Sequence, residues 1–183
     1  PRPLLLLVPR HPQRFDAVAE LVRQAGLALR RRSEWTEAPP ADAAGADVWL
    51  GDSMGEMALY YGSADVALLG GSFEPLGGQN LIEAAACGCP VVMGPHTFNF
   101  AEAATLAEAA GASRRVDSIE AGLDAALALL ADGSALATAG ASARAFAAAH
   151  RGAARRMAEA IDALWPTPRA EVQSGSASRT DRE

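Results

Sequence analysis

The chain has 183 residues, half of them hydrophobic and 21% charged, a composition typical of one soluble globular domain rather than a disordered segment. Its formal net charge of -6 disfavours nucleic acid as a partner, because a phosphate backbone would on average be repelled. The two cysteines, Cys87 and Cys89, support neither a disulfide framework nor a zinc site, and the apolar run at residues 4–8 is too short to span a bilayer.

Short apolar strands alternate with helical stretches up to Val116, which predicts stacked βαβ units. The first strand is expected at residues 4–8, and its helix runs from Pro12 to a stop at Gly26. Five further strands are expected at residues 27–31, 47–50, 65–69, 90–93 and 113–116. The pattern therefore predicts an α/β fold, a Rossmann-like parallel sheet with helices on both faces.

The remainder of the chain is expected to be helical. From Ser118 onward apolar residues recur at helical spacing, and a last helix carrying Met157 and Ile161 ends before Pro166. We expect residues 1–165 to form one domain and residues 166–183, rich in Ser, Gly and Arg, to be a disordered polar tail.

A pair of glycines before a helix is the first candidate ligand site. Gly77, Gly78 and Gln79 follow an apolar strand and lead into a helix that begins near Asn80, an arrangement that lets a phosphate approach unpaired backbone amides. Glu83 lies about one turn further on, where its carboxylate could accept hydrogen bonds from the two hydroxyls of a ribose. The alternative is that Asn80 caps the helix and Glu83 reaches back to it without any ligand.

A second candidate is GDSMGEM, which begins at Gly51, where the Met54, Gly55 and Glu56 backbone could meet a base or phosphate. Here Ser53 and Glu56 have the spacing of a capping box, which is the stronger reading of the pattern alone. A third candidate is VPRHP, in which Arg10 follows the first strand. Ligands of open α/β sheets bind at the carboxyl ends of strands, so three such sites in one chain favour a nucleotide.

These segments resemble a known family. VPRHPQRF, GDSMGEM, the GGS and GGQN turns, NLIEAAA and PVVMGPHTFNF occur in this order, and over about residues 1–165 they look like the carboxyl-terminal half of bacterial Kdo (3-deoxy-D-manno-octulosonic acid) transferases. The resemblance implies a GT-B glycosyltransferase, of which this chain is the domain that binds the donor CMP-Kdo. The CMP contacts that it implies are Pro9, Arg10, Met54, Gly55, Glu56, Asn80, Leu81, Ile82 and Glu83.

The resemblance also implies where the rest of the chemistry lies. In the family a glutamate of the amino-terminal domain is the catalytic base, and that domain carries the lipid A precursor site and the membrane anchor. We therefore expect the complete enzyme at the cytoplasmic face of the bacterial inner membrane and expect no transfer by this chain alone. No metal or cofactor is implied, and Glu56 and Glu83 are expected to bind the donor rather than act as bases.

Several alternatives stay open at this point. The chain could be a non-catalytic nucleotide-binding module, or a GT-B transferase that uses another nucleotide sugar. Many family members have histidine where this chain has Gln79, so any role of charge there is in doubt. We expect Phe98 and Phe100 to be core anchors and the arginines at 30–32 to be a solvated face, with binding to an anionic membrane as the alternative.

Overall fold

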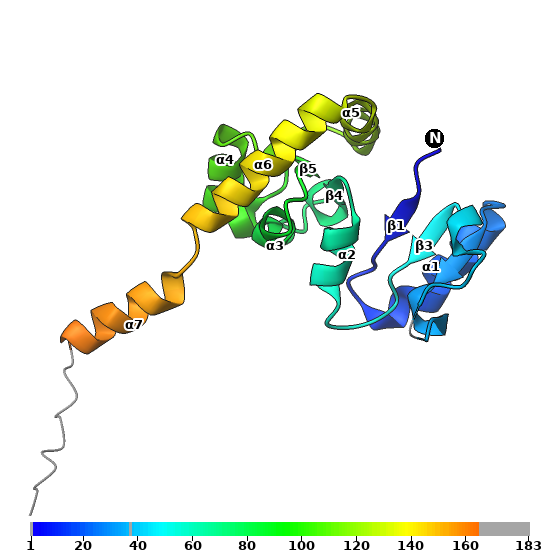
Figure 1. Cartoon of the computed structure of the whole chain (residues 1–183), viewed down its shortest axis with the longest axis horizontal. Helices are drawn as coiled ribbons and strands as arrows, with labels where there is room; N and C mark the ends of the chain where they lie inside the picture. The colour runs from blue at the N-terminus through cyan, green and yellow to red at the C-terminus, as the bar shows by residue number, and fades with distance from the viewer. Residues whose placement is uncertain (1, 37, 165–183) are drawn as a thin grey trace, which may run out of the picture. The chain divides into compact units, whose positions relative to one another are not determined.

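The computed structural model describes residues 2–36 and 38–164 (Figure 1). The chain divides between Ala149 and His150 into two compact units, and all the strands belong to the first of them. The second unit contains α7 (Ala153–Leu164). The tail expected at residues 166–183 lies outside the described residues, so the predicted domain boundaries remain a prediction.

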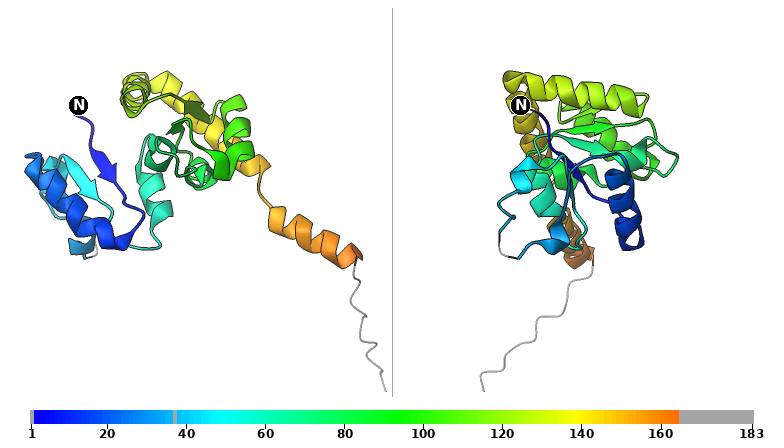
Figure 2. Two further views of the ribbon diagram at one scale, coloured as in Figure 1. Left: turned by 180° about the vertical axis from the view of Figure 1, so that it is seen from behind. Right: turned by 90° about the vertical axis from the view of Figure 1, so that its right-hand side faces the viewer.

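The first sheet contains three parallel strands, β1 (Leu5–Leu7), β2 (Leu29–Arg31) and β3 (Val48–Leu50), in the order β1-β3-β2. In this register Trp49 lies between Leu6 and Arg30. Helix α1 (Phe15–Gln24) connects the first two strands and packs on the sheet through Ala19 and Val22, which are buried (Figures 1 and 2). The predicted strand, helix and stop at Gly26 are confirmed, since Gly26 has the positive φ that ends the helix.

The second sheet contains β4 (Ala67–Leu69), β5 (Val91–Met93) and β6 (Ser113–Arg115), again parallel and in sequence order. All six expected strands are therefore present, and the α/β class with parallel strands is confirmed. The expected single open sheet is not what the described residues form, because they pair as two three-stranded sheets. Apolar patterning identifies a strand without saying which neighbour it pairs with.

Helices α3 (Leu81–Ala86), α4 (Ala101–Ala109) and α6 (Gly133–Ala149) build the core of the second sheet with it. The core is rich in alanine, and Figures 1 and 2 show α3 and α6 side by side. Small residues permit this approach: a Cβ on Gly140 would lie 3.1 Å from the carbonyl oxygen of Gly88. The position of α3, which follows the glycine turn, therefore depends on small residues behind it.

Helix α5 (Ile119–Ala131) is capped by Ser118, whose hydroxyl accepts a hydrogen bond from the Ala121 amide at 3.2 Å. Ile119, Leu123 and Leu127 are four positions apart and share one face of the helix, and all three are exposed. Within the described ranges no single helix meets the length and hydropathy of a membrane span; α5 and α6 meet them only as a pair that is bent by 107°.

Candidate functional site

The loop at residues 51–56 joins β3 to α2 (Met57–Ser63) and is anchored first at Asp52. The Asp52 side chain is fully buried and accepts hydrogen bonds from the Ser33 amide at 2.8 Å, the Ser33 hydroxyl at 2.6 Å and Arg31 Nε at 2.6 Å. Burial alone would raise the pKa of this carboxyl, but the hydrogen bonds from Ser33 and Arg31 outweigh it and lower the pKa below its usual value. Asp52 is therefore ionised and structural.

The loop is anchored a second time at Glu56. Arg32 Nη2 donates to one carboxylate oxygen at 2.7 Å, while the other accepts from the Ser53 hydroxyl and, at 3.4 Å, from the Tyr60 hydroxyl. The hydrogen bond from Ser53, followed by Arg32 and Tyr60, lowers the pKa of Glu56. A carboxylate with a lowered pKa is a weak base, which agrees with the expectation that Glu56 is no general base.

The capping box expected at Ser53 and Glu56 is wrong. Helix α2 begins at Met57, its N-cap is Glu56, and no side chain bonds to its first amides. The two residues interact through their side chains instead, because positive φ at Gly55 turns the chain before the helix starts. Met54 and Gly55 are exposed at the tip of this turn.

The glycine turn before α3 depends on the conformational freedom of its two glycines. Gly77 and Gly78 have φ of +86° and +77°, which only glycine adopts readily. The Gly78 amide donates to the Gly71 carbonyl at 3.2 Å, and the Gly71 amide donates to Gln79 Oε1 at 3.3 Å. Gln79 therefore ties the two glycine pairs together as a neutral hydrogen-bond acceptor.

Asn80 caps α3, and Glu83 contacts it. Asn80 Oδ1 accepts from the Ile82 amide at 3.1 Å, and its Nδ2 donates to Glu83 Oε1 at 3.0 Å. The ligand-free alternative is thus correct about the cap, yet Glu83 is exposed and Asn80 occupies only one of its two oxygens. Leu81 is buried, with 1% of the whole residue exposed, so the structure does not present it to a ligand.

A further loop, at residues 94–100, packs against the glycine turn. The Gly94 amide donates to the Ser72 hydroxyl at 2.7 Å and the His96 amide to the Ser72 carbonyl at 2.9 Å. Asn99 Nδ2 donates to the Leu76 carbonyl at 3.2 Å. Phe98 is 63% exposed, so its expected role as a core anchor is wrong, while Phe100 is half-buried.

Sequence reasoning missed three groups in this site: Ser72, Arg115 and the Arg31–Ser33 segment. Arg115 lies at the end of β6 and donates to the Thr97 hydroxyl at 2.9 Å and the Gly94 carbonyl at 3.3 Å. The serine of the GGS turn was a usable signal, since a serine after two glycines is suited to bonding backbone groups. The arginine partners lie far away along the chain and left no local signal.

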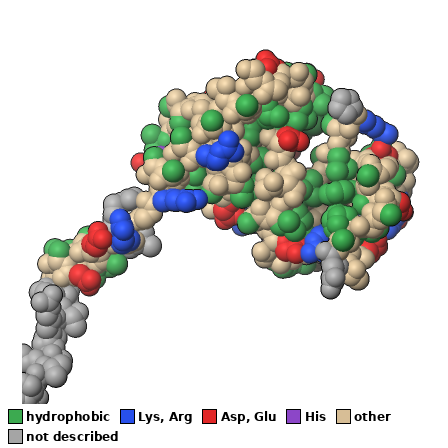
Figure 3. Space-filling view, in the orientation of Figure 1, with side chains coloured by type: hydrophobic (Ala, Val, Ile, Leu, Met, Phe, Trp, Pro, Cys, Tyr) green, Lys and Arg blue, Asp and Glu red, His purple; other side chains and the backbone are tan. Residues whose placement is uncertain are grey.

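The arginines at residues 30–32 do not form a solvated face, which corrects that expectation. Arg30 pairs with Asp42, Arg31 with Asp16 and Asp52, and Arg32 with Glu56. Figure 3 shows basic side chains beside acidic ones on the face that it presents. Because these guanidinium groups already have carboxylate partners, the alternative of an anionic membrane loses its support.

The second and third candidate sites, residues 51–56 and VPRHP, are neighbours in space. Parallel pairing of β1 with β3 places the loops after both strands at the same edge, and a Cβ on Gly51 would lie 2.9 Å from the Val8 side chain. Pro9 is half-buried and Arg10 is exposed, with no cap made by His11. The pairing of the strands therefore brings VPRHP next to the loop at residues 51–56.

Packing between α2 and α3 relates the second candidate, residues 51–56, to the first, the glycine turn before α3. Cys87 Sγ lies 3.7 Å from the Ala58 carbonyl oxygen, and burial, followed by the charge of nearby Glu83, raises the pKa of Tyr61 to about 12. Convergence of all three candidates on one nucleotide remains a prediction, as do the individual CMP contacts.

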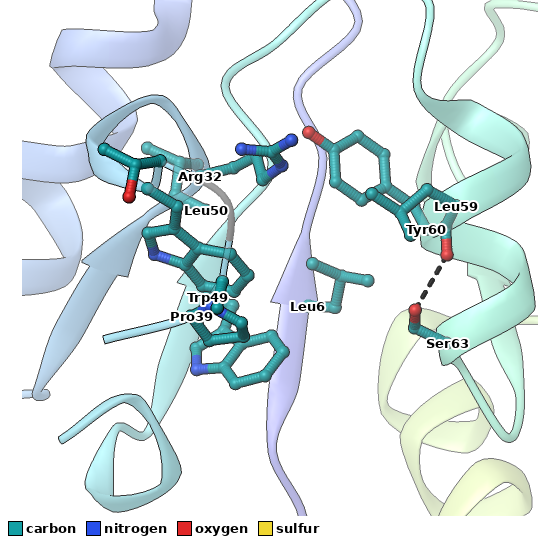
Figure 4. A pocket seen from close by; sticks show the side chains of 11 residues that line it. Leu6, Arg32, Pro39, Trp49, Leu50, Leu59, Tyr60 and Ser63 are labelled. Carbon is teal, nitrogen blue, oxygen red and sulfur yellow. Dashed lines mark hydrogen bonds between the residues drawn. The ribbon is translucent and has the colours of Figure 1, made fainter. Parts of the chain in front are cut away.

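A cavity of about 250 Å³ lies between the first sheet and α2 (Figure 4). Leu6 and Trp49 face it from the strands, while Leu59, Tyr60 and Ser63 face it from the helix. None of the predicted CMP contacts lines this cavity. Arg32 and Tyr60, which bond to Glu56 at the end of the loop at residues 51–56, do line it. Among the described side chains, no group of three or more His, Cys, Asp or Glu could hold a metal ion.

Comparison with known proteins finds relatives that share one name. No family model matches the chain. A 3-deoxy-D-manno-octulosonic acid transferase of Bordetella pertussis is 54% identical over 162 residues, which are 88% of this chain and 37% of that protein. A transferase of the same name from Haemophilus influenzae is 49% identical over 56% of this chain and 23% of its own length. The chain thus spans about a third or less of these relatives.

A solved structure matches a larger share of its own length. The crystal structure of the C-terminal CMP-Kdo binding domain of WaaA from Acinetobacter baumannii superposes with a TM-score of 0.71 at 34% sequence identity. The match covers 78% of this chain and 72% of that domain. The agreement of sequence and fold over most of both chains identifies the family.

Proposed function

The chain belongs to the Kdo transferase family, as a counterpart of its carboxyl-terminal domain, and on that basis we propose that it binds the nucleotide-sugar donor CMP-Kdo. The observation that carries the proposal is the solved relative, whose name states that it binds CMP-Kdo and which matches 78% of this chain at 34% sequence identity. The exposed Glu83 carboxylate can accept hydrogen bonds from ribose hydroxyls. The Gly77–Gly78 turn beside it is buried and its Gly78 amide bonds to the Gly71 carbonyl, so it does not present the unpaired amides expected for a phosphate.

The roles within this site differ between the two glutamates. Glu83 has an oxygen that Asn80 does not occupy, and it is the group proposed to accept hydrogen bonds from the ribose. Both Glu56 oxygens are engaged by Arg32, Ser53 and Tyr60, so residues 54–56 are proposed to act through their backbone. Pro9, Arg10 and residues 80–82 complete the proposed contacts.

The complete enzyme is proposed to transfer Kdo from CMP-Kdo to a lipid A precursor at the cytoplasmic face of the inner membrane. The chain corresponds to 37% of the Bordetella pertussis relative, so the acceptor site, the catalytic base and the membrane contact are assigned to the family's amino-terminal domain. No metal ion takes part in the proposed reaction.

We expect CMP to bind the chain and Glu83→Ala to weaken that binding about tenfold, because a hydrogen bond to a charged group contributes about 1.5–3 kcal/mol. Isothermal titration calorimetry with CMP measures the change. Glu20→Ala is the matched control, since Glu20 is an exposed carboxylate on α1 that accepts a hydrogen bond from Gln24.

Titration with UMP tests whether the site recognises the cytosine base of the nucleotide. Preference for CMP over UMP supports a cytidine donor, whereas equal affinity for the two, or unchanged CMP binding by Glu83→Ala, contradicts the proposal. Equal binding would favour a transferase that uses another nucleotide sugar.

A further inference from the structure

Three consecutive residues, from the last residue of β2 onward, hold the loop at residues 51–56. Arg31 and Ser33 bond to Asp52, and Arg32 bonds to Glu56. The bonded residues are 19 to 24 positions apart in sequence, so the bonds join two separate segments at one end of the first sheet. The loop is thus fixed near its beginning and at its end.

The tip between these anchors is open. Met54 is 69% exposed, and Gly55 has φ of +78° with no atom within 4 Å of the place where its Cβ would lie. A ligand can therefore approach the backbone of residues 54–55 directly. The two anchors determine how that backbone is oriented.

The bond from Arg32 to Glu56 is the anchor nearer to the start of α2. It is 2.7 Å long, the Arg32 side chain is 25% exposed, and its Cζ lies 5.8 Å from the centre of the Trp35 ring. The indole of Trp35 in turn meets that of Trp49 edge to face at 4.9 Å. Arg32 therefore has a packed position from which it holds Glu56, while Ser53 and Tyr60 hold the other carboxylate oxygen.

We propose that Arg32 is a positioning residue for the nucleotide: by holding the Glu56 carboxylate it keeps the backbone of residues 54–56 in the orientation that the donor needs. The proposal rests on the proposed function, because it assigns a role within that binding site. A loop that is ordered before binding loses less conformational entropy when the ligand binds. The hydrogen bond from Arg32 to Glu56, already present in the free protein, therefore increases the affinity for the donor.

The test compares Arg32→Gln with Arg30→Gln. Arg30 lies two positions earlier, forms a similar ion pair with Asp42 and has no bond to the loop at residues 51–56. We expect Arg32→Gln to weaken CMP binding about tenfold in calorimetry, the size of one lost charge-assisted hydrogen bond, and Arg30→Gln to leave it unchanged. Arg32→Lys, which keeps the charge, is expected to restore most of the affinity.

A double-mutant cycle separates positioning from direct contact and from a general loss of structure. If Arg32 acts through Glu56, then Arg32→Gln has no further effect on CMP affinity in a Glu56→Gln background. Full additivity of the two substitutions, or equal binding by Arg32→Gln and Arg30→Gln, overturns the proposal. Failure of the unsubstituted chain to bind CMP instead overturns the proposed function itself, so the two failures are distinguishable.

Discussion

Asp52→Asn is expected to lower the free energy of unfolding by about 3 kcal/mol, because breaking a buried charge pair leaves its partners unmatched. Three hydrogen bonds converge on this fully buried carboxylate, from Arg31 Nε and from the Ser33 amide and hydroxyl. An asparagine amide retains one oxygen but places an NH₂ group against one of these donors. Urea denaturation followed by circular dichroism measures the change.

The same carboxylate predicts a dependence on pH. The pKa of Asp52 is lower in the folded chain than in the unfolded one. The ionised carboxylate therefore makes its full contribution to the free energy of unfolding above the pKa of an unfolded aspartate, about 3.9, and loses it as the pH falls through the folded pKa. We therefore expect the stability difference between the parent chain and Asp52→Asn to shrink below about pH 4.

Asp42→Asn is the control for this prediction. Asp42 pairs with Arg30, but its side chain is 64% exposed, and exposed ion pairs contribute about 0–1 kcal/mol. Equal destabilisation by Asp52→Asn and Asp42→Asn, or a difference between them that persists unchanged at low pH, would contradict the structural role of Asp52.

Gly94→Ala is expected to cost about 3 kcal/mol, at the upper end for overpacking, and to abolish measurable CMP binding. A Cβ at this position would lie 2.5 Å from the carbonyl oxygen of Ser72 and 2.8 Å from its carbonyl carbon. Both are backbone atoms, so the turn at residues 70–78 must move to relieve the contact. Thermal unfolding and calorimetry with CMP measure the two effects.

Gly70→Ala is the matched control, because Gly70 lies in the turn at residues 70–78 that Gly94→Ala is expected to displace. Gly70 has no positive φ, and a Cβ added there would have no heavy atom within 4 Å. We expect it to bind CMP as the parent chain does. If Gly94→Ala keeps both its stability and its CMP affinity, the contact between these two loops is not what positions the glycine turn.

The local features of the fold were predictable from the sequence. All six strands and the helix before Gly26 follow from apolar runs and glycine placement, which act within a few residues. The cap of α3 by Asn80 was visible for the same reason. Each of these signals depends on neighbours in sequence.

The features that escaped prediction depend on distant partners. The bond from Arg32 to Glu56 joins residues 24 positions apart, and that from Arg115 to Thr97 joins residues 18 apart. An arginine run is equally compatible with a solvated face until the carboxylates opposite it are known. Likewise, the Ser53–Glu56 spacing matches a capping box, but the spacing does not reveal that Gly55 turns the chain before α2 begins.

Each of the two sheets is made from one continuous stretch of chain, residues 5–50 for the first and 67–115 for the second. Strand contacts that close over short sequence separations form early, since little loop entropy is lost. On a ribosome, the first sheet has all of its strands as soon as Leu50 has emerged, before any strand of the second has left the exit tunnel. Assembly of this chain can thus follow the direction of translation.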